Sequence, residues 1–297
     1  MPLVLDVADT AVSSLDECVD ALRATGFRPR EDESLHHAAL QLRRLGNNPT
    51  FLGDRIVAEL ARRHREEDDG NSYGAAVLML APAGGADFFM RANIWPSADE
   101  HAVRASSHDS FVYEMPHDHN FSFLTLGYFG PGYWSSYYEY DYAQVAGWTG
   151  EPVDLRFVER SRLEPGKIQL YRAHLDVHAQ HAPDALSVSL NVMQTSASVG
   201  WLDQYRFDTD AGRVARIVSY GSSEAFVRIA AGLGHAEGLD LVQRFAVGHP
   251  SDRMRLACFG ALALASDDPD GVWRRAEGSG SRMIAMEARA KRAALVG

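Results

Sequence analysis

The sequence predicts a mainly β protein, a barrel or sandwich of short strands with helical segments before and after it. Short apolar runs separated by Gly and Pro fill the middle of the chain, as expected of many strands joined by turns. Apolar residues at helical spacing precede these runs and return after them. The predicted divisions are a helical segment at residues 1–72, a β-barrel at 73–207 and a second helical segment at 208–297.

The N-terminal segment contains three amphipathic stretches. Ser14 and Glu17 have the spacing of a capping box, in which each side chain accepts a hydrogen bond from the other residue's amide, so a helix is predicted to begin there. Helical periodicity also covers residues 35–45 and 51–64. The charged run at 62–70 then predicts a solvated helix end and a linker.

The β region consists of short apolar runs bounded by turn residues. Gly130-Pro131-Gly132 and Pro165-Gly166 are clear turn signals between two such runs. Strands are predicted at residues 75–80, 87–95, 111–114, 121–128, 133–143, 153–158, 167–171 and 186–193.

The C-terminal segment returns to the helical period, with helices predicted at residues 225–233, 239–247, 252–265 and 282–295. Arg253-Met254 and Arg282-Met283 begin similar Ala-rich helices, which suggests a degenerate, HEAT-like helix-pair repeat. A helical cap that buries its own apolar face is the simpler interpretation.

Composition narrows the functional class. The chain has 297 residues, 46% of them hydrophobic, and a net charge of −11, which is typical of a globular protein and disfavours binding to nucleic acid. No run of eighteen apolar residues predicts a membrane span. Cys18 and Cys258 give no disulfide framework. Asp6, Asp9 and Asp16 interrupt any secretory leader, so a cytoplasmic location is expected.

Histidines provide the strongest chemical signal. His117 and His119 are two residues apart, so on a strand their side chains share one face. A pair of neutral imidazoles on one face is a natural pair of metal ligands, and a third histidine on a neighbouring strand would leave positions open for a substrate. His174 and His178 are four residues apart and would share a face, whereas His181 would point the other way. Both His174 and His178 remain candidates for the third ligand.

Two motifs resemble those of a known superfamily. Met115-Pro116-His117-Asp118-His119 matches the first motif of the cupins, and Pro165-Gly166 with His178 downstream resembles the second. Most cupins have a glutamate four or five residues after the first motif, where this chain has Phe123 and Leu124. Cysteine dioxygenase-like cupins also lack that glutamate.

The resemblance to cysteine dioxygenase-like proteins implies a cupin-like β-barrel (jelly roll) and three histidine ligands, His117, His119 and His178, holding Fe(II). Zn, Ni or Mn are the alternative metals, with His174 as the alternative third ligand. The cysteine that some of these enzymes join to a tyrosine is missing here. An early-strand arginine that holds the substrate carboxylate in the family corresponds to Arg91.

Further residues are candidates for the site. Gln169 and Asn191 are predicted on strands that face the cavity, and alternation puts Tyr138 and Tyr140 on one face, so all four are candidate substrate contacts. Packing is the simpler role for the tyrosines. Tyr205 follows the last predicted barrel strand and is a candidate catalytic acid, although residues 201–207 are equally interpretable as a linker.

Three functions follow as hypotheses. The first is a mononuclear non-haem iron dioxygenase acting with O₂ on a small chelating substrate, a thiol or an amino-acid-like molecule. The second is a non-redox metal cupin, an isomerase or hydrolase, and the third is a sensor that binds a ligand without turnover. Cupin-like barrels often pair through sheet edges, which makes a homodimer an expectation.

Overall fold

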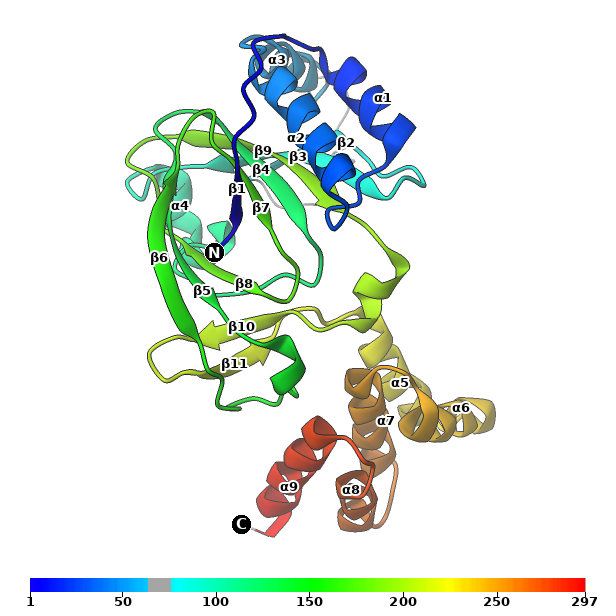
Figure 1. Ribbon diagram of the computed structural model, residues 1–297. Helices are drawn as coiled ribbons and strands as arrows, with labels where there is room; N and C mark the ends of the chain where they lie inside the picture. Colours follow the sequence, from blue (N-terminus) through cyan, green and yellow to red (C-terminus); the bar gives the residue numbers. More distant parts are fainter. Residues whose placement is uncertain (64–75, 297) are drawn as a thin grey trace. The chain divides into compact units, whose positions relative to one another are not determined.

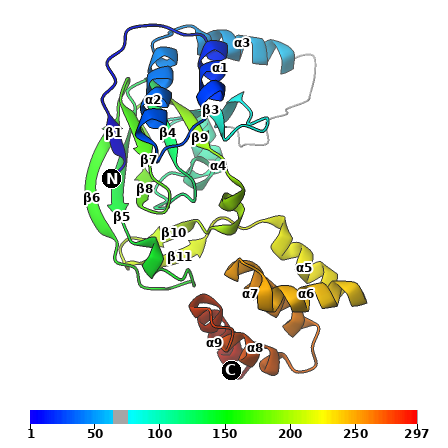
Figure 2. The same cartoon turned by 45° about the vertical axis from the view of Figure 1, so that its right-hand side comes forward.

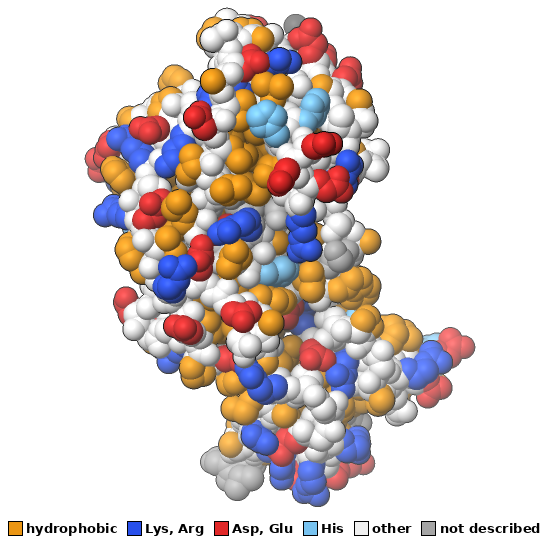
Figure 3. All heavy atoms as spheres, in the orientation of Figure 1, with side chains coloured by type: hydrophobic (Ala, Val, Ile, Leu, Met, Phe, Trp, Pro, Cys, Tyr) orange, Lys and Arg blue, Asp and Glu red, His pale blue; other side chains and the backbone are white. Residues whose placement is uncertain are grey.

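The computed structural model describes residues 1–63 and 76–296. The predicted linker at 62–70 lies, from residue 64 onward, outside the described residues, as does the first residue of the strand predicted at 75–80. No described helix is long and apolar enough to cross a bilayer. Acidic and basic side chains are interspersed over the face shown in Figure 3.

The chain forms two compact units. The barrel unit comprises Met1–Tyr140 and Arg156–Ala197, and the C-terminal unit comprises Asp141–Leu155 and Ser198–Gly297. The N-terminal helices therefore belong to the same unit as the strands that follow them. The three-part division of the sequence remains a prediction about which segments fold independently.

The N-terminal helices are α1 (Leu15–Thr25), α2 (Asp32–Gly46) and α3 (Phe51–Arg63). The predicted capping box is confirmed, because the Ser14 hydroxyl accepts the Glu17 amide at 3.2 Å and the Glu17 carboxylate accepts the Ser14 amide at 2.8 Å. These helices lie on the larger sheet in Figures 1 and 2.

Two antiparallel sheets form the β core. The larger has the strand order β1-β7-β4-β9-β3-β2 and the smaller β6-β5-β8, and this antiparallel core with flanking helices confirms the predicted fold class. The strands are β1 (Leu3–Leu5), β2 (Val77–Ala81), β3 (Phe88–Trp95), β4 (Phe123–Phe129), β5 (Tyr133–Glu139), β6 (Arg156–Leu163), β7 (Ile168–Tyr171), β8 (Asp176–Gln180) and β9 (Ser187–Gln194).

The strand predicted at 111–114 is wrong. The chain instead forms α4 (His101–Ser106) and a short 3-10 helix, η1 (His108–Phe111). Val112 and Glu114 then adopt positive φ angles of 61° and 53°, which are incompatible with a strand. The β-branched and aromatic residues here suit a strand locally, but the backbone turns instead.

The larger sheet has one apolar face and one face with polar residues. Met90, Leu124 and Leu190 are buried in a core that also contains Leu22 and Leu42 from the helices. Because side chains alternate along a strand, the residues between them point away from the helices, toward the smaller sheet. Contacts between the sheets confirm this direction: the hydroxyls of Tyr137 and Tyr171 are 2.9 Å apart, and Trp95 and Tyr133 have ring centroids 4.5 Å apart.

The C-terminal unit contains a hairpin and five helices within the described residues. The hairpin, β10 and β11, was not predicted, nor was α8, although Asp268 caps it by accepting the Gly271 amide at 2.8 Å and Pro269 occupies its first turn. The other predicted helices are confirmed. The elements are β10 (Tyr205–Asp208), β11 (Arg213–Ile217), α5 (Ser222–Gly232), α6 (Ala236–Gly248), α7 (Asp252–Leu264), α8 (Pro269–Glu277) and α9 (Arg282–Val296).

Candidate metal centre

Three histidines converge inside the barrel unit. His178 lies on β8, and His117 pairs with it through two backbone hydrogen bonds, 3.0 and 2.9 Å long. In such a pair the two side chains lie on the same face. The Nε2 atom of His178 is 3.1 Å from that of His117 and 3.2 Å from that of His119. One nitrogen from each of the three rings lies within 4.8 Å of both others.

These separations match the geometry of metal ligands. Bonds of about 2.1 Å at angles between 90° and tetrahedral place ligand nitrogens about 3.0 to 3.4 Å apart. Burial, followed by the charges of neighbouring side chains, holds the pKa of both His119 and His178 well below its ordinary value. The imidazoles are therefore neutral, as metal binding requires. The donor set fits one divalent ion, and within the described part of the chain it includes no carboxylate.

The ring of His117 is oriented by a hydrogen bond behind it. Its Nδ1 is 2.7 Å from the carbonyl oxygen of Met115. A carbonyl only accepts, so Nδ1 carries the proton and Nε2 presents its lone pair to the cluster. The Nδ1 atoms of His119 and His178 are buried and have no hydrogen-bond partner among the described residues, so each keeps one hydrogen bond available for water.

Aromatic side chains enclose the cluster on one side. Phe123 lies 4.9 Å from the His119 ring, and Tyr171 lies 4.6 Å from the His178 ring. Phe123 and Tyr171 stack with centroids 4.5 Å apart and planes 5° apart. Tyr137, directly opposite His178 on β5, bonds Tyr171 through the two hydroxyls. This wall lowers the local dielectric and excludes water from one side of the cluster.

A row of four polar residues crosses the inner face of the larger sheet. Arg91 on β3 pairs with Asn191 on β9, which pairs with Thr125 on β4, which pairs with Gln169 on β7. Cross-strand partners share a face, so these residues form one continuous row, called here the polar row. Sequence reasoning predicted three of its members and missed Thr125. The sequence signal for Thr125 was the alternation Phe123–Leu124–Thr125, in which only Leu124 belongs to the apolar core beneath the helices.

The polar row lies beside the histidines. The charge of Arg91 is among the causes that lower the pKa of His119. Gln169 is fully buried, with its Oε1 3.4 Å from the Tyr137 hydroxyl and its Nε2 without a hydrogen-bond partner among the described residues. Among the described residues, Asn191 makes only long side-chain contacts, 3.4 Å, to two carbonyl oxygens. The row thus offers buried polar groups whose hydrogen-bonding capacity is incompletely used.

Gln180 is a member of the site that sequence reasoning missed. It lies two residues after His178 on β8, on the same face, and is buried. Its side-chain nitrogen is 3.3 Å from Nε2 of His178. The signal was the same two-residue spacing that identified His117 and His119.

His174 and Tyr140 lie next to the cluster but outside it. His174 has a positive φ of 61° in the loop before β8, and its Nδ1 is 3.9 Å from the Asp118 carboxylate. Burial, and then the charge of Arg30, lowers the pKa of His174 to about 4. The buried Tyr140 hydroxyl donates to Asp118 at 2.6 Å. The structure therefore places neither side chain among the atoms that converge in the histidine cluster.

Tyr138 faces away from His178, and Tyr205 belongs to a different unit of the chain. Tyr138 pairs with Val177, so it faces away from His178, and its ring lies 5.4 Å from Phe157. Tyr137 takes the inner position instead. Tyr205 lies on β10 in the C-terminal unit, where it stacks on Tyr142 at 5.7 Å. Neither placement supports the predicted role.

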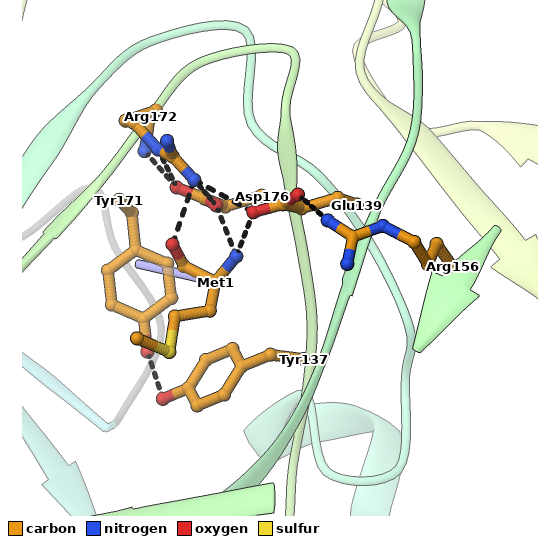
Figure 4. A network of polar contacts seen from close by, with 7 residues as sticks. All are labelled: Met1, Tyr137, Glu139, Arg156, Tyr171, Arg172 and Asp176. Atoms are coloured by element: carbon orange, nitrogen blue, oxygen red, sulfur yellow. Dashed lines mark hydrogen bonds and ion pairs between the residues drawn. The ribbon is translucent and has the colours of Figure 1, made fainter. Parts of the chain in front are cut away.

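A polar network holds the connection between β7 and β8 (Figure 4). The buried Asp176 carboxylate accepts from the Arg172 backbone amide at 2.7 Å and from its guanidinium at 3.0 and 2.7 Å. Arg172 also bonds Glu139 at 3.1 Å, and Glu139 in turn pairs with Arg156 and the Met1 amine. The network fixes the strand that carries His178.

No protein-family model and no curated protein matches this sequence. Among solved structures, a salicylate 1,2-dioxygenase from Pseudaminobacter salicylatoxidans is 12% identical with a TM-score of 0.26, the match covering 48% of this chain and 33% of that one. This chain thus spans a third of that enzyme's length. A cupin-like protein from Thermotoga maritima is 13% identical with a TM-score of 0.25, and the match covers 47% of this chain and 89% of that one. The DMSP lyase DddQ from Ruegeria pomeroyi is 13% identical with a TM-score of 0.28, and the match covers 66% of this chain and 79% of that one.

Proposed function

We propose that this protein is a mononuclear non-haem iron dioxygenase of the cysteine dioxygenase-like type, with Fe(II) held by His117, His119 and His178. The observation that carries the proposal is the convergence of three imidazole nitrogens at ligand spacing. Such an ion, when bound, supplies a Lewis acid and one-electron chemistry with O₂. Three neutral ligands leave its charge uncompensated and about three positions open.

The polar row determines which substrate fits. Arg91 provides a positive charge beside His119, suited to the carboxylate of an amino-acid-like molecule or a thiol acid. Asn191 and Gln169 offer amide groups in the same row, which would orient the rest of the substrate. With the carboxylate held at Arg91, a thiol or amine of the same small molecule would be directed at the histidine cluster.

The aromatic wall has a separate role. Phe123, Tyr137 and Tyr171 close one side of the cluster and hold the Tyr171 ring against His178. Burial raises the pKa of Tyr171 well above its ordinary value, so its hydroxyl stays protonated. In this proposal the wall keeps bulk water from the reacting atoms and donates no proton of its own at neutral pH.

A non-redox metal enzyme is the second candidate. Three histidines are also a common zinc donor set, and one bound water then gives hydrolytic or isomerase chemistry. Ni or Mn would serve similarly. A sensor that binds a ligand on the polar row without turnover is the third candidate. The homodimer and the cytoplasmic location remain predictions.

Metal analysis separates these candidates. Protein purified without added metal would be assayed for iron, zinc, nickel and manganese, together with a His117→Ala/His119→Ala variant. About one iron per chain, absent from the variant, with O₂ uptake on a panel of thiols and amino acids, supports the dioxygenase. Zinc, nickel or manganese without O₂ uptake supports the non-redox enzyme, and equal metal content in both proteins contradicts the site.

A further inference from the structure

Gln180 is the one residue of the site whose role the three-histidine assignment leaves open. Its side chain is buried at the end of β8, and its Nε2 lies 3.3 Å from the Nε2 atom of His178. Its Oε1 is buried with no hydrogen-bond partner among the described residues. A buried amide oxygen without a partner is costly, and its presence calls for an interaction that the protein alone does not provide.

The spacing around His178 is informative. The Nε2 atoms of His117 and His119 lie 3.1 and 3.2 Å from His178 Nε2, and the amide end of Gln180 lies at 3.3 Å. All three contacts have the separation of two ligands on one metal ion. The end of the Gln180 side chain is therefore at ligand distance from the central histidine.

The amide orientation follows from the charge of a bound ion. When His178 gives its lone pair to a metal, Nε2 no longer accepts a hydrogen bond, and an NH₂ group beside a cation is repelled. Turning the amide by half a rotation exchanges its oxygen and nitrogen without moving the side chain otherwise. The oxygen then faces the ion, and the orphaned acceptor acquires a partner.

We propose that Gln180 Oε1 is a fourth protein ligand of the substrate-free metal centre. This inference rests on the proposed function, because it requires the three histidines to hold an ion. Gln180 supplies an oxygen ligand from β8, whereas the position after the first motif holds Phe123 and Leu124. A neutral oxygen leaves the charge of the centre unchanged, and about two positions of a six-coordinate ion stay open.

Co²⁺ binding to the full chain tests the proposal without any substrate. The dissociation constant would be measured by competition with a chromophoric chelator, and the visible ligand-field bands recorded at saturation. The proteins are the wild type, Gln180→Leu, Gln180→Glu, His117→Ala and, as a matched control, Gln41→Leu, which removes a buried amide of α2 outside the site. Circular dichroism checks that each is folded.

The expected result is a loss of Co²⁺ affinity of about tenfold or more in Gln180→Leu, with shifted ligand-field bands. Gln180→Glu should bind Co²⁺ more tightly than the wild type, because a carboxylate is the stronger ligand, and Gln41→Leu should match the wild type. Wild-type affinity and bands in Gln180→Leu would overturn the fourth ligand while leaving the three histidines in place. Equal losses in Gln180→Leu and Gln41→Leu would also overturn it. A wild-type protein that binds no Co²⁺, or binding insensitive to His117→Ala, would overturn the proposed function as well.

Discussion

His119 and His178 are 59 residues apart in the chain, yet their Nε2 atoms lie 3.2 Å from each other. Two uncharged imidazoles share at most one proton between such atoms, so the pair lacks a stable arrangement unless a proton or a cation lies between them. Burial lowers the pKa of both rings and so disfavours a charged imidazolium, which leaves a neutral N–H donor or a bound cation between the two atoms. The relationship between these two residues is the core of the metal assignment.

Metal binding should stabilise the fold. At a metal concentration a hundredfold above Kd, binding contributes about 2.7 kcal/mol, which raises the melting temperature by several degrees. Differential scanning calorimetry with and without Fe²⁺ (anaerobic) or Zn²⁺ measures the shift, and a chelator should reverse it. His119→Ala should melt at one temperature under both conditions, and a persistent shift in that variant would contradict the site.

Arg91→Leu should weaken substrate binding. A hydrogen bond to a charged group contributes about 1.5–3 kcal/mol, so KM for an anionic substrate should rise roughly tenfold to a hundredfold with a smaller change in kcat. Metal content should be unchanged. Arg104→Leu, at an exposed position of α4, is the matched control, and equal effects of the two substitutions would argue against the clamp.

Asp176→Asn should loosen the strand that carries His178. Asp176 is buried whereas Arg172 is more than a third exposed, so solvent screening reduces the value of their ion pair to about 2 kcal/mol. Urea denaturation measures the loss. The more exposed Glu139→Gln should cost less, and a double-mutant cycle with Arg172→Met isolates the pair.

Arg253→Met should destabilise the C-terminal unit. The buried Arg253 guanidinium is 2.5 Å from both Asp203 and Glu224. Its removal leaves two carboxylates without compensation at a cost of about 3–5 kcal/mol. Arg213→Met, which breaks an exposed pair with Asp208, should cost less than about 1 kcal/mol. Denaturation curves compare the two variants, and similar losses of stability would contradict a large contribution from the buried Arg253 ion pairs.

Both cysteines should be inert in the folded protein. Burial raises the pKa of Cys18 to about 12 and that of Cys258 to about 11. The thiolate is the reactive form, so at pH 8 only about one Cys18 side chain in ten thousand is reactive. Titration with a chromogenic disulfide reagent should detect the two thiols only after denaturation. Rapid reaction of either one in the native protein would show that it is accessible.

The sequence predicted the histidine pair because side chains two residues apart lie on the same face of any extended segment. It mispredicted Tyr138 because alternation does not say which alternate positions face inward. That choice depends on register, and the pairing of Tyr137 with His178 sets it. The β5–β6 register also shifts between Tyr137 and Tyr138.

The sequence predicted three members of the polar row but not their arrangement, for a related reason. Its members lie on strands ordered β7-β4-β9-β3, and the spacing of residues along the chain does not reveal which strands are neighbours. The β10–β11 hairpin that carries Tyr205 also depends on pairing that the sequence did not reveal, and the catalytic role of Tyr205 stays a prediction. Long-range pairing decided each of these cases.

The two faces of the larger sheet meet different demands at adjacent positions. Arg91 and Asn191 face inward, while their chain neighbours Met90 and Leu190 pack in the core beneath the helices. Substitutions along the polar row would therefore change the chemistry of the inner face without disturbing the apolar layer beneath the helices. The proposed substrate preference can therefore be changed one residue at a time while the fold is kept.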